Sequence, residues 1–194
     1  MKKLISLLVA GSLIAACNNS DETKTDNNAP NSAASTTDEA KAENKNNSGT
    51  DQATTDFIMK AAQGGMMEVQ LGEMAQRNAS SQAVKDFGSR MVTDHTKANN
   101  ELKALADARN VQLPTVLEGQ HREHVNDLGK KSGADFDKAY MDMMVDDHNE
   151  DVDEFEKASN NLKDDGIKAF AAKTLPVLRS HLEAAKNVQQ QVKK

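Results

Sequence analysis

The 194-residue chain has little of what several protein classes require. It contains one cysteine, no tryptophan, three prolines and only 3% aromatic residues. A single cysteine excludes a disulfide within the chain and a cysteine-based metal cluster. After residue 50, no stretch shows the alternating Val, Ile and Thr pattern of β-strands, and helix-forming residues dominate. We therefore expect residues 51–194 to form one all-α domain, which is long enough to bury a core of its own.

The sequence also lacks the common signatures of enzymes and of nucleic-acid-binding proteins. It has no nucleophile elbow and no glycine-rich phosphate loop. The formal net charge is −6, and removal of Lys2 and Lys3 with a leader would leave −8, so nucleic acid is not an expected partner. The sequence leaves catalysis undecided and favours a role other than that of an enzyme.

The first residues have the pattern of an export signal. Two lysines are followed by an apolar run over residues 4–16 and then by the sole cysteine, Cys17. The run is shorter than the roughly 20 residues that span a bilayer, as in a cleaved signal peptide. The stretch from Ile14 to Cys17 resembles the lipobox of bacterial lipoproteins, which implies that residues 1–16 are a signal peptide and that Cys17 carries lipid. The alternative is a stray or buried cysteine.

Residues 17–50 are predicted to form a disordered tether. The stretch is rich in Asn, Ser, Thr, Asp, Glu, Lys and Ala and has hardly any large apolar side chain. Such a composition buries too little apolar surface to offset the entropy lost on ordering, although a binding tail is an alternative. We expect lipid to hold the mature protein on a membrane of the bacterial envelope, at the outer membrane or a periplasmic face, without spanning it.

A short motif occurs twice in the helical region. Its copies, MVTDH and MVDDH, run from Met91 to His95 and from Met144 to His148. The residues three and four positions from each histidine are apolar, so both histidines lie on the buried stripe of an amphipathic helix. A looser third version ends at His181. We therefore expect three helices to bury one histidine each.

We predict four long helices and one shorter helix. The expected segments are 51–78, the stretch from the Ser80-Ser81 cap to about 109, 116–130, 132–162 with a capping-box-like start, and the stretch from the 164–166 turn to about 192, with a kink at Pro176. The long connection over residues 110–133 separates two tight hairpins. This connectivity is typical of a ferritin-like four-helix bundle rather than of a simple up-down bundle.

Four pieces of the sequence also match one known family. They are Glu68, the motif that ends at His95, Phe136-Asp137-x-x-Tyr140 followed by His148, and Leu175-Pro176 followed by His181-Leu182. Over residues 55–188 the chain thereby resembles the ferritin-like bundle proteins of bacterial envelopes known as domain of unknown function 4142. The resemblance implies a secreted or lipid-anchored helical bundle without an established activity.

The two-metal centres of ferritin-like proteins use a Glu-x-x-His pair on each of two helices. In this chain Val92, Val145 and Leu178 stand three residues before the core histidines, which argues against a di-iron oxidase or ferroxidase. A Glu-x-x-His pair does occur at Glu118 and His121. It lies in a polar crossover, where a solvated surface helix is the simpler interpretation.

The three histidines and Glu68 should lie at one level of the bundle, because each is near the middle of its helix. Glu68 is placed on the inward face of its helix among small residues. Three imidazoles and a carboxylate supply the donor types of a first shell for one divalent transition metal, such as zinc, iron, manganese or copper. Asp94 and Asp147, next to two of the histidines in the sequence, could orient them as hydrogen-bond acceptors.

A structural polar network is the alternative to a metal site. An ionised Glu68 could pair with a protonated histidine, because a buried charge without a partner is costly. The protein would then be a structural or interaction module whose polar core fixes the register of its helices. Six methionines could bind copper or simply fill the core: Met66, Met67, Met91, Met141, Met143 and Met144. The metal content of the purified domain separates these hypotheses.

Overall fold

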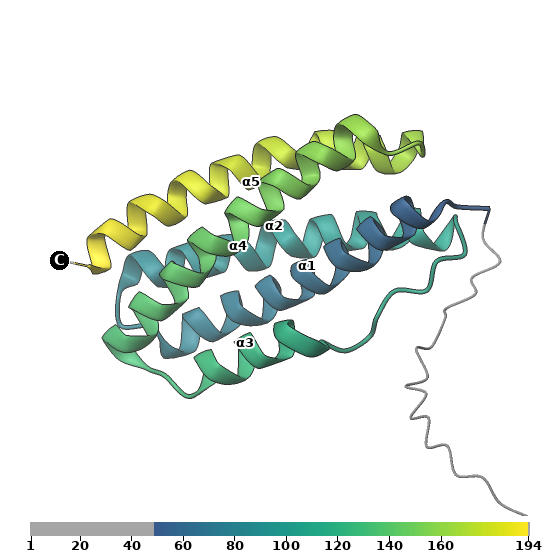
Figure 1. The fold of residues 1–194 in the computed structure, drawn as a ribbon. Helices are drawn as coiled ribbons and strands as arrows, with labels where there is room; N and C mark the ends of the chain where they lie inside the picture. The colour runs from purple at the N-terminus through teal and green to yellow at the C-terminus, as the bar shows by residue number, and fades with distance from the viewer. Residues whose placement is uncertain (1–48, 194) are drawn as a thin grey trace, which may run out of the picture. The chain divides into compact units, whose positions relative to one another are not determined.

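The computed structural model describes residues 49–193, which form five α-helices (Figure 1). They are α1 (Gln52–Asn78), α2 (Gln82–Asp107), α3 (Gly119–Gly129), α4 (Gly133–Asn161) and α5 (Asp165–Val192). No strand occurs within 49–193, which confirms the prediction of an all-α domain. None of these helices is apolar enough over a sufficient length to cross a membrane. The predicted signal peptide, Cys17 and residues 18–48 of the predicted tether lie outside the described residues.

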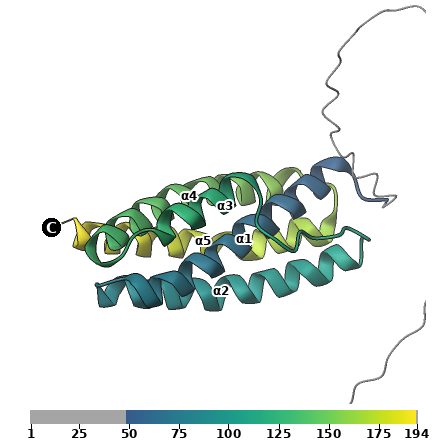
Figure 2. The same cartoon turned by 90° about the horizontal axis from the view of Figure 1, so that it is seen from below.

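The four long helices form two hairpins that face each other. α1 packs along α2 and α4 packs along α5, while α2 meets α5 and α1 meets α4 between the hairpins (Figures 1 and 2). The connection between the hairpins carries α3, which lies beside α1 and touches α4. The middle of the molecule is therefore enclosed by four helices, and one side of α1 is covered by the crossover.

Two of the helices start with an aspartate cap. Asp51 accepts a hydrogen bond from the backbone N–H of Thr54 at 3.1 Å, and Asp164 accepts one from that of Ile167 at 2.9 Å. Each carboxylate satisfies a donor that the first turn of its helix leaves free. Pro176 lies inside α5, whose helical backbone continues to Val192.

The start of α2 is capped differently from the prediction. Ser81 occupies the N-cap position, but its side chain makes no capping hydrogen bond. The carboxylate of Asp137 on α4 accepts from the backbone N–H groups of Ser80 at 3.0 Å and of Ser81 at 2.9 Å, and also from the Ser80 hydroxyl. Ser132, at the start of α4, makes no side-chain cap either. The α1–α2 turn is thus fastened to the other hairpin by a buried carboxylate.

An ion pair joins the hairpins at the opposite end of the bundle. Arg109, just after α2, donates from Nε to Oδ2 of Asp164 at 2.8 Å and makes a second contact from Nη2 to Oδ1. Its Nη1 also donates to the carbonyl of Leu105 at 2.7 Å. A two-point pair between a guanidinium and a carboxylate has a fixed geometry, so it sets the end of α2 against the start of α5.

The apolar core has two parts of different composition. One part contains the buried methionines Met67, Met91, Met141 and Met144. The other contains Phe57, Phe155 and Phe170 and no buried methionine. Along α2, α4 and α5 the core histidine falls between residues of these two clusters. A layer of polar side chains therefore divides the core near its middle.

Close contact between α1 and α2 depends on two glycines. A Cβ atom on Gly72 would lie 2.6 Å from the carbonyl oxygen of Gly88, and a Cβ atom on Gly88 would lie 2.7 Å from Cβ of Ala75. Both distances are too short for non-bonded atoms, so the backbones approach more closely here than any residue with a side chain allows.

Candidate metal centre

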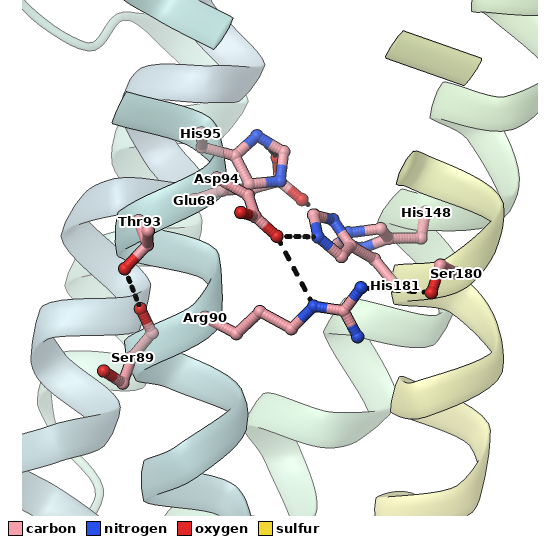
Figure 3. Close-up of polar contacts among 9 residues, drawn as sticks. All are labelled: Glu68, Ser89, Arg90, Thr93, Asp94, His95, His148, Ser180 and His181. Atoms are coloured by element: carbon pink, nitrogen blue, oxygen red, sulfur yellow. Dashed lines mark hydrogen bonds and ion pairs between the residues drawn. The ribbon is translucent and has the colours of Figure 1, made fainter. Parts of the chain in front are cut away.

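Each long helix contributes one buried polar side chain to the middle of the bundle (Figure 3). Glu68 comes from α1, His95 from α2, His148 from α4 and His181 from α5, and their exposed fractions are 1%, 6%, 0% and 1%. The apolar residues one turn away on each helix pack into the core and carry the polar residue inward with them. The prediction that three helices each bury one histidine is confirmed.

The three imidazoles lie beside one another. The ring centroids of His95 and His148 are 5.9 Å apart, and each lies 5.4 Å from the ring of His181. One nitrogen from each ring lies within 4.8 Å of one nitrogen from each of the other two. Nitrogens bound to one tetrahedral zinc ion would be roughly 3.4 Å apart, so the rings need to approach by up to about 1.4 Å to share an ion. We refer to these three residues as the histidine centre.

Glu68 lies against two of the rings. Its Oε2 is 2.7 Å from Nδ1 of His95, and its Oε1 is 3.3 Å from Nδ1 of His148. These are ion-pair distances, although neither oxygen has a hydrogen-bond partner of good geometry. Nδ1 of His148 also lies 2.9 Å from the backbone carbonyl of Met144, one turn earlier in α4. The carboxylate therefore occupies the Nδ1 side of both rings.

Asp94 orients a histidine other than its neighbour in the sequence. Its Oδ2 lies 2.8 Å from Nε2 of His181, across the interface between α2 and α5 (Figure 3). Arg90 lies 3.4 Å from the same oxygen through Nε and donates from Nη2 to the hydroxyl of Ser180 at 3.0 Å. The second predicted acceptor, Asp147, has no hydrogen-bond partner at Oδ2 among residues 49–193. The structure therefore brings Asp94, but not Asp147, to a histidine.

In each ring one nitrogen is paired and the other is free. Nε2 of His95, Nε2 of His148 and Nδ1 of His181 are buried and have no hydrogen-bond partner in the described part of the chain. The remaining nitrogens face Glu68, the Met144 carbonyl and Asp94. Metal-binding histidines characteristically use one nitrogen for a carboxylate or carbonyl and the other for the ion. Glu68 faces Nδ1 of both His95 and His148, and its role as a direct ligand stays a prediction.

Burial and neighbouring charges set the protonation of the site. Burial acts to lower the pKa of His95, but the Glu68 carboxylate outweighs it and raises that pKa. Burial lowers the pKa of His148, and it lowers the pKa of His181 to about 4. Burial acts to raise the pKa of Glu68, but the charges of His95 and His148 lower it. At neutral pH Glu68 is therefore ionised and favours the charged form of His95, while His148 and His181 are neutral imidazoles, the form that binds metals.

Two hollows meet at Glu68. A cavity of about 20 Å³ lies beside Glu68, His95 and Asp151. Because a water molecule needs about 10–15 Å³ of such space, this cavity has room for one water or one ion. A second hollow, the acidic pocket, has a volume of about 60 Å³. It is lined by Lys60, Gly64, Met67, Glu68, His121, Asp147, Glu150, Asp151 and Glu154.

The acidic pocket was not foreseen from the sequence, although a signal was present. Asp147, Glu150, Asp151 and Glu154 are spaced by three, one and three residues, which places them on one face of α4. Burial, followed by the charge of Glu68, raises the pKa of Asp147 to about 7 and raises that of Asp151 well above its usual value.

The Glu-x-x-His pair at Glu118 and His121 is expected from the sequence to lie on a solvated surface helix. Glu118 is the N-cap residue of α3, and His121 lies on the wall of the acidic pocket.

Comparison with known proteins gives a family and a fold. A family model described as a domain of unknown function, DUF4142, matches residues 36–188. The chain belongs to the DUF4142 family. This agrees with the family inferred from the motifs around the core histidines, and it brings no established activity with it. No curated protein sequence matches the chain.

Two solved structures resemble the DUF4142 chain in fold. A DUF305 fragment from Deinococcus radiodurans has a TM-score of 0.65 at 9% identity, over 73% of this chain and 98% of that one. A DUF305 protein from Streptomyces coelicolor, named as a candidate secreted protein, has a TM-score of 0.61 at 12% identity, over 72% of this chain and 93% of that one. At such identities the likeness concerns the fold alone.

Proposed function

We propose that this DUF4142 protein is a lipid-anchored protein of the bacterial cell envelope whose ferritin-like four-helix bundle binds one divalent transition metal. The ligands are His95, His148 and His181. The observation that carries the proposal is that the three buried imidazoles each bring one ring nitrogen within 4.8 Å of one nitrogen from each of the other two. Three ring nitrogens are also buried without a partner, which costs about 1–3 kcal/mol each, and a bound ion would remove that cost for every such nitrogen that it contacts.

The surrounding residues would hold the ligands. Glu68 lies 2.7 Å from Nδ1 of His95, and Asp94 accepts a hydrogen bond from Nε2 of His181, which would fix the rings and make them better donors. Imidazole ligands suit zinc, copper and iron, whereas manganese prefers oxygen ligands. Among the four metals expected from the sequence, the ligand set therefore favours zinc, copper or iron. A fourth position is left for water or for one oxygen of Glu68.

The corresponding role is metal handling or protection against metal stress at the envelope. Support for this location comes from the lipobox resemblance between Ile14 and Cys17. A fold neighbour that is named as a candidate secreted protein is compatible with it. Replacing Cys17 with Ala should prevent lipidation. If the wild type and this variant partition identically between detergent and aqueous phases, the anchor proposal fails.

Elemental analysis and thermal melts of protein purified without an affinity tag test the metal site. A metal at about 100 times its dissociation constant stabilises the native state by about 2.7 kcal/mol. At about 2–4 °C per kcal/mol, the melting temperature should rise by roughly 5–10 °C. His95→Leu should abolish this rise. His124→Leu, a matched change on α3 away from the centre, should retain it.

A structural module remains the second candidate because two contacts join helices without any metal. Glu68 pairs with His95 between α1 and α2 at 2.7 Å, and Asp94 pairs with His181 between α2 and α5 at 2.8 Å. Such a network can fix the register of a bundle by itself. A protein without stoichiometric metal, and with melts that no metal shifts, would leave this second function in place of the first.

A further inference from the structure

The acidic pocket has more carboxyl groups than basic side chains. Five carboxylates line it, from Glu68, Asp147, Glu150, Asp151 and Glu154. Its one lysine, Lys60, is 2.5 Å from Glu154 and so balances that side chain. Among residues 49–193, no lysine or arginine forms an ion pair with Asp147, Glu150 or Asp151. A hollow lined by this excess of carboxyl groups favours cations over anions.

The buried end of the pocket is also a wall of the histidine centre. The side chain of Glu68 is only 2% exposed, and neither of its oxygens makes a hydrogen bond of good geometry. Glu68 and Asp151 line both the acidic pocket and the small cavity beside His95. Two carboxylates thus stand between an acidic hollow and an imidazole ligand of the proposed metal.

We propose that the acidic pocket between α1, α3 and α4 is the route by which divalent cations enter the histidine centre. The inference rests on the metal-binding function proposed above and assigns its entrance. An ion would be drawn in with part of its water shell, pass to Glu68 and Asp151, and then reach the free nitrogen of His95. At the roughly 10–15 Å³ that one water molecule needs, the volume of about 60 Å³ has room for about four to six waters, which suits a partly hydrated ion.

The spacing of the carboxylates favours a route over a second permanent site. Within 49–193, only the three core histidines bring three donor atoms within 4.8 Å of one another. The carboxylates of the pocket do not converge to that degree. They can therefore attract an ion and exchange its waters without enclosing it.

The groove on the other side of the bundle differs in charge. It has a volume of about 110 Å³ and lies between α2 and α5, where it shares Ala98 and Thr174 with the small cavity. Its charged residues are Asp94, Lys97, Glu101 and Lys173, so acidic and basic side chains are equal in number. Nζ of Lys173 lies 2.7 Å from Glu101. A balanced groove gives a cation no comparable attraction.

Rates of metal loading test the route independently of the site. The probe is Co²⁺ mixed with the purified full chain at low salt, followed in stopped flow by the visible absorption that develops when cobalt binds histidine nitrogen. Glu150→Lys reverses a charge at the exposed edge of the pocket, and Glu183→Lys makes the same change on the exposed face of α5. Gly64→Leu places a side chain in the pocket, where a Cβ atom meets nothing within 4 Å, and Gly64→Ala is its control.

The lysine variants test whether charge attracts the ion, and the Gly64 variants test whether open space in the pocket lets it pass. Glu150→Lys should slow cobalt association about tenfold and weaken its dependence on salt, whereas Glu183→Lys should stay within about twofold of the wild type. Gly64→Leu should slow association and dissociation about equally and leave the dissociation constant unchanged. Gly64→Ala should load at the wild-type rate. In every variant the stoichiometry should remain that of the wild type.

Two results would overturn the route. One is wild-type loading rates in both Glu150→Lys and Gly64→Leu. The other is slower cobalt loading in Glu101→Lys, a change in the groove between α2 and α5, while the variants of the acidic pocket load at the wild-type rate. That pattern would place the entrance in the groove. Failure of the metal site itself shows at equilibrium instead, as a wild-type protein that takes up no cobalt. That result would contradict both the metal site and the route. If the centre takes up cobalt and the pocket variants load at the wild-type rate, only the route is contradicted.

Discussion

Asp94 accepts a hydrogen bond from Nε2 of His181 at 2.8 Å, although its neighbour in the sequence is His95. The contact crosses from α2 to α5, between the two hairpins. Arg90, one turn before Asp94, stands 3.4 Å from the same carboxylate oxygen. With Nε2 held in this way, Nδ1 is the nitrogen of His181 that remains free.

Asp94→Ala should weaken metal binding without unfolding the bundle. Loss of a carboxylate that orients a ligating histidine typically costs about 10–100-fold in metal affinity. Asp94 is partly exposed, so the fold should tolerate the change. Competition against a coloured chelator measures the dissociation constant, and Asp146→Ala, an exposed change on α4, is the control. Equal affinities in the two variants would show that Asp94 has no part in orienting His181.

The pair formed by Glu68 and His95 predicts a stability pattern in the metal-free protein. His95→Leu leaves the Glu68 carboxylate buried without its nearest partner, and breaking a buried pair in this way costs about 3–5 kcal/mol. Glu68→Leu combined with His95→Leu removes both charges and should restore most of that loss, because apolar residues of similar volume can replace a buried pair. Thermal melts in chelator measure the effect.

The comparison that matters is between the single and the double variant. If Glu68→Leu/His95→Leu is no more stable than His95→Leu, Glu68 does not carry a charge that His95 compensates. The same melts without chelator show whether any stabilisation by metal survives. Neither variant should retain it, since both lack one imidazole ligand.

Periodicity in the sequence was enough to predict the buried histidines. Spacing by three and four residues decides which side of a helix faces the core, and for His95, His148 and His181 that side is the one shared with apolar neighbours. The prediction that these histidines and Glu68 share one level of the bundle needed only their positions near the middle of their helices. The family model matches residues 36–188, a range that includes all three histidines.

Contacts between helices could not be predicted in the same way. Whether Asp94 meets His95 or His181 depends on how α2 and α5 are rotated about their axes. The cap of α2 comes from Asp137, which is 56 residues away from Ser81 in the sequence. The partner of His148 at Met144 is a backbone carbonyl, a group that every residue carries and that no motif can reveal.

The raised pKa of Asp147 predicts how stability changes with pH. Burial, followed by the charges of Glu68 and Glu150, raises this pKa from 3.8 to about 7. Between these values the native state holds a proton that the unfolded state has released, so the free energy of unfolding falls as the pH rises through this range. Asp147→Asn removes the titrating group. We expect it to stabilise the metal-free protein by about 1–3 kcal/mol near pH 7.5, after allowance for partial exposure to solvent, and to have little effect near pH 4.

Denaturant unfolding in chelator at several values between pH 4 and pH 8 checks this. The difference in unfolding free energy between Asp147→Asn and the wild type should grow with pH. Glu183→Gln, which removes an exposed carboxylate on α5, should give a small difference that does not change with pH. A constant difference for Asp147→Asn as well would mean that its carboxyl group titrates normally in the folded protein.

Asp137 should matter for stability and not for metal binding. Its side chain is 3% exposed and accepts three hydrogen bonds from Ser80 and Ser81, so it both caps α2 and ties the α1–α2 turn to α4. Loss of a helix cap together with charged hydrogen bonds should cost about 2–3 kcal/mol, because two part-buried backbone N–H groups lose their acceptor. The melting temperature of Asp137→Ala should therefore fall by roughly 5–10 °C.

Asp153→Ala is the matched control, since Asp153 is an exposed aspartate on the same helix, and its melting temperature should stay close to that of the wild type. Asp137→Asn retains an oxygen acceptor and should lie between the two. Because the histidine centre is about three helical turns from the cap along α4, Asp137→Ala should still bind metal with wild-type affinity below its melting temperature. A loss of metal affinity equal to that of Asp94→Ala would show that fastening the turn to α4 is needed to assemble the centre.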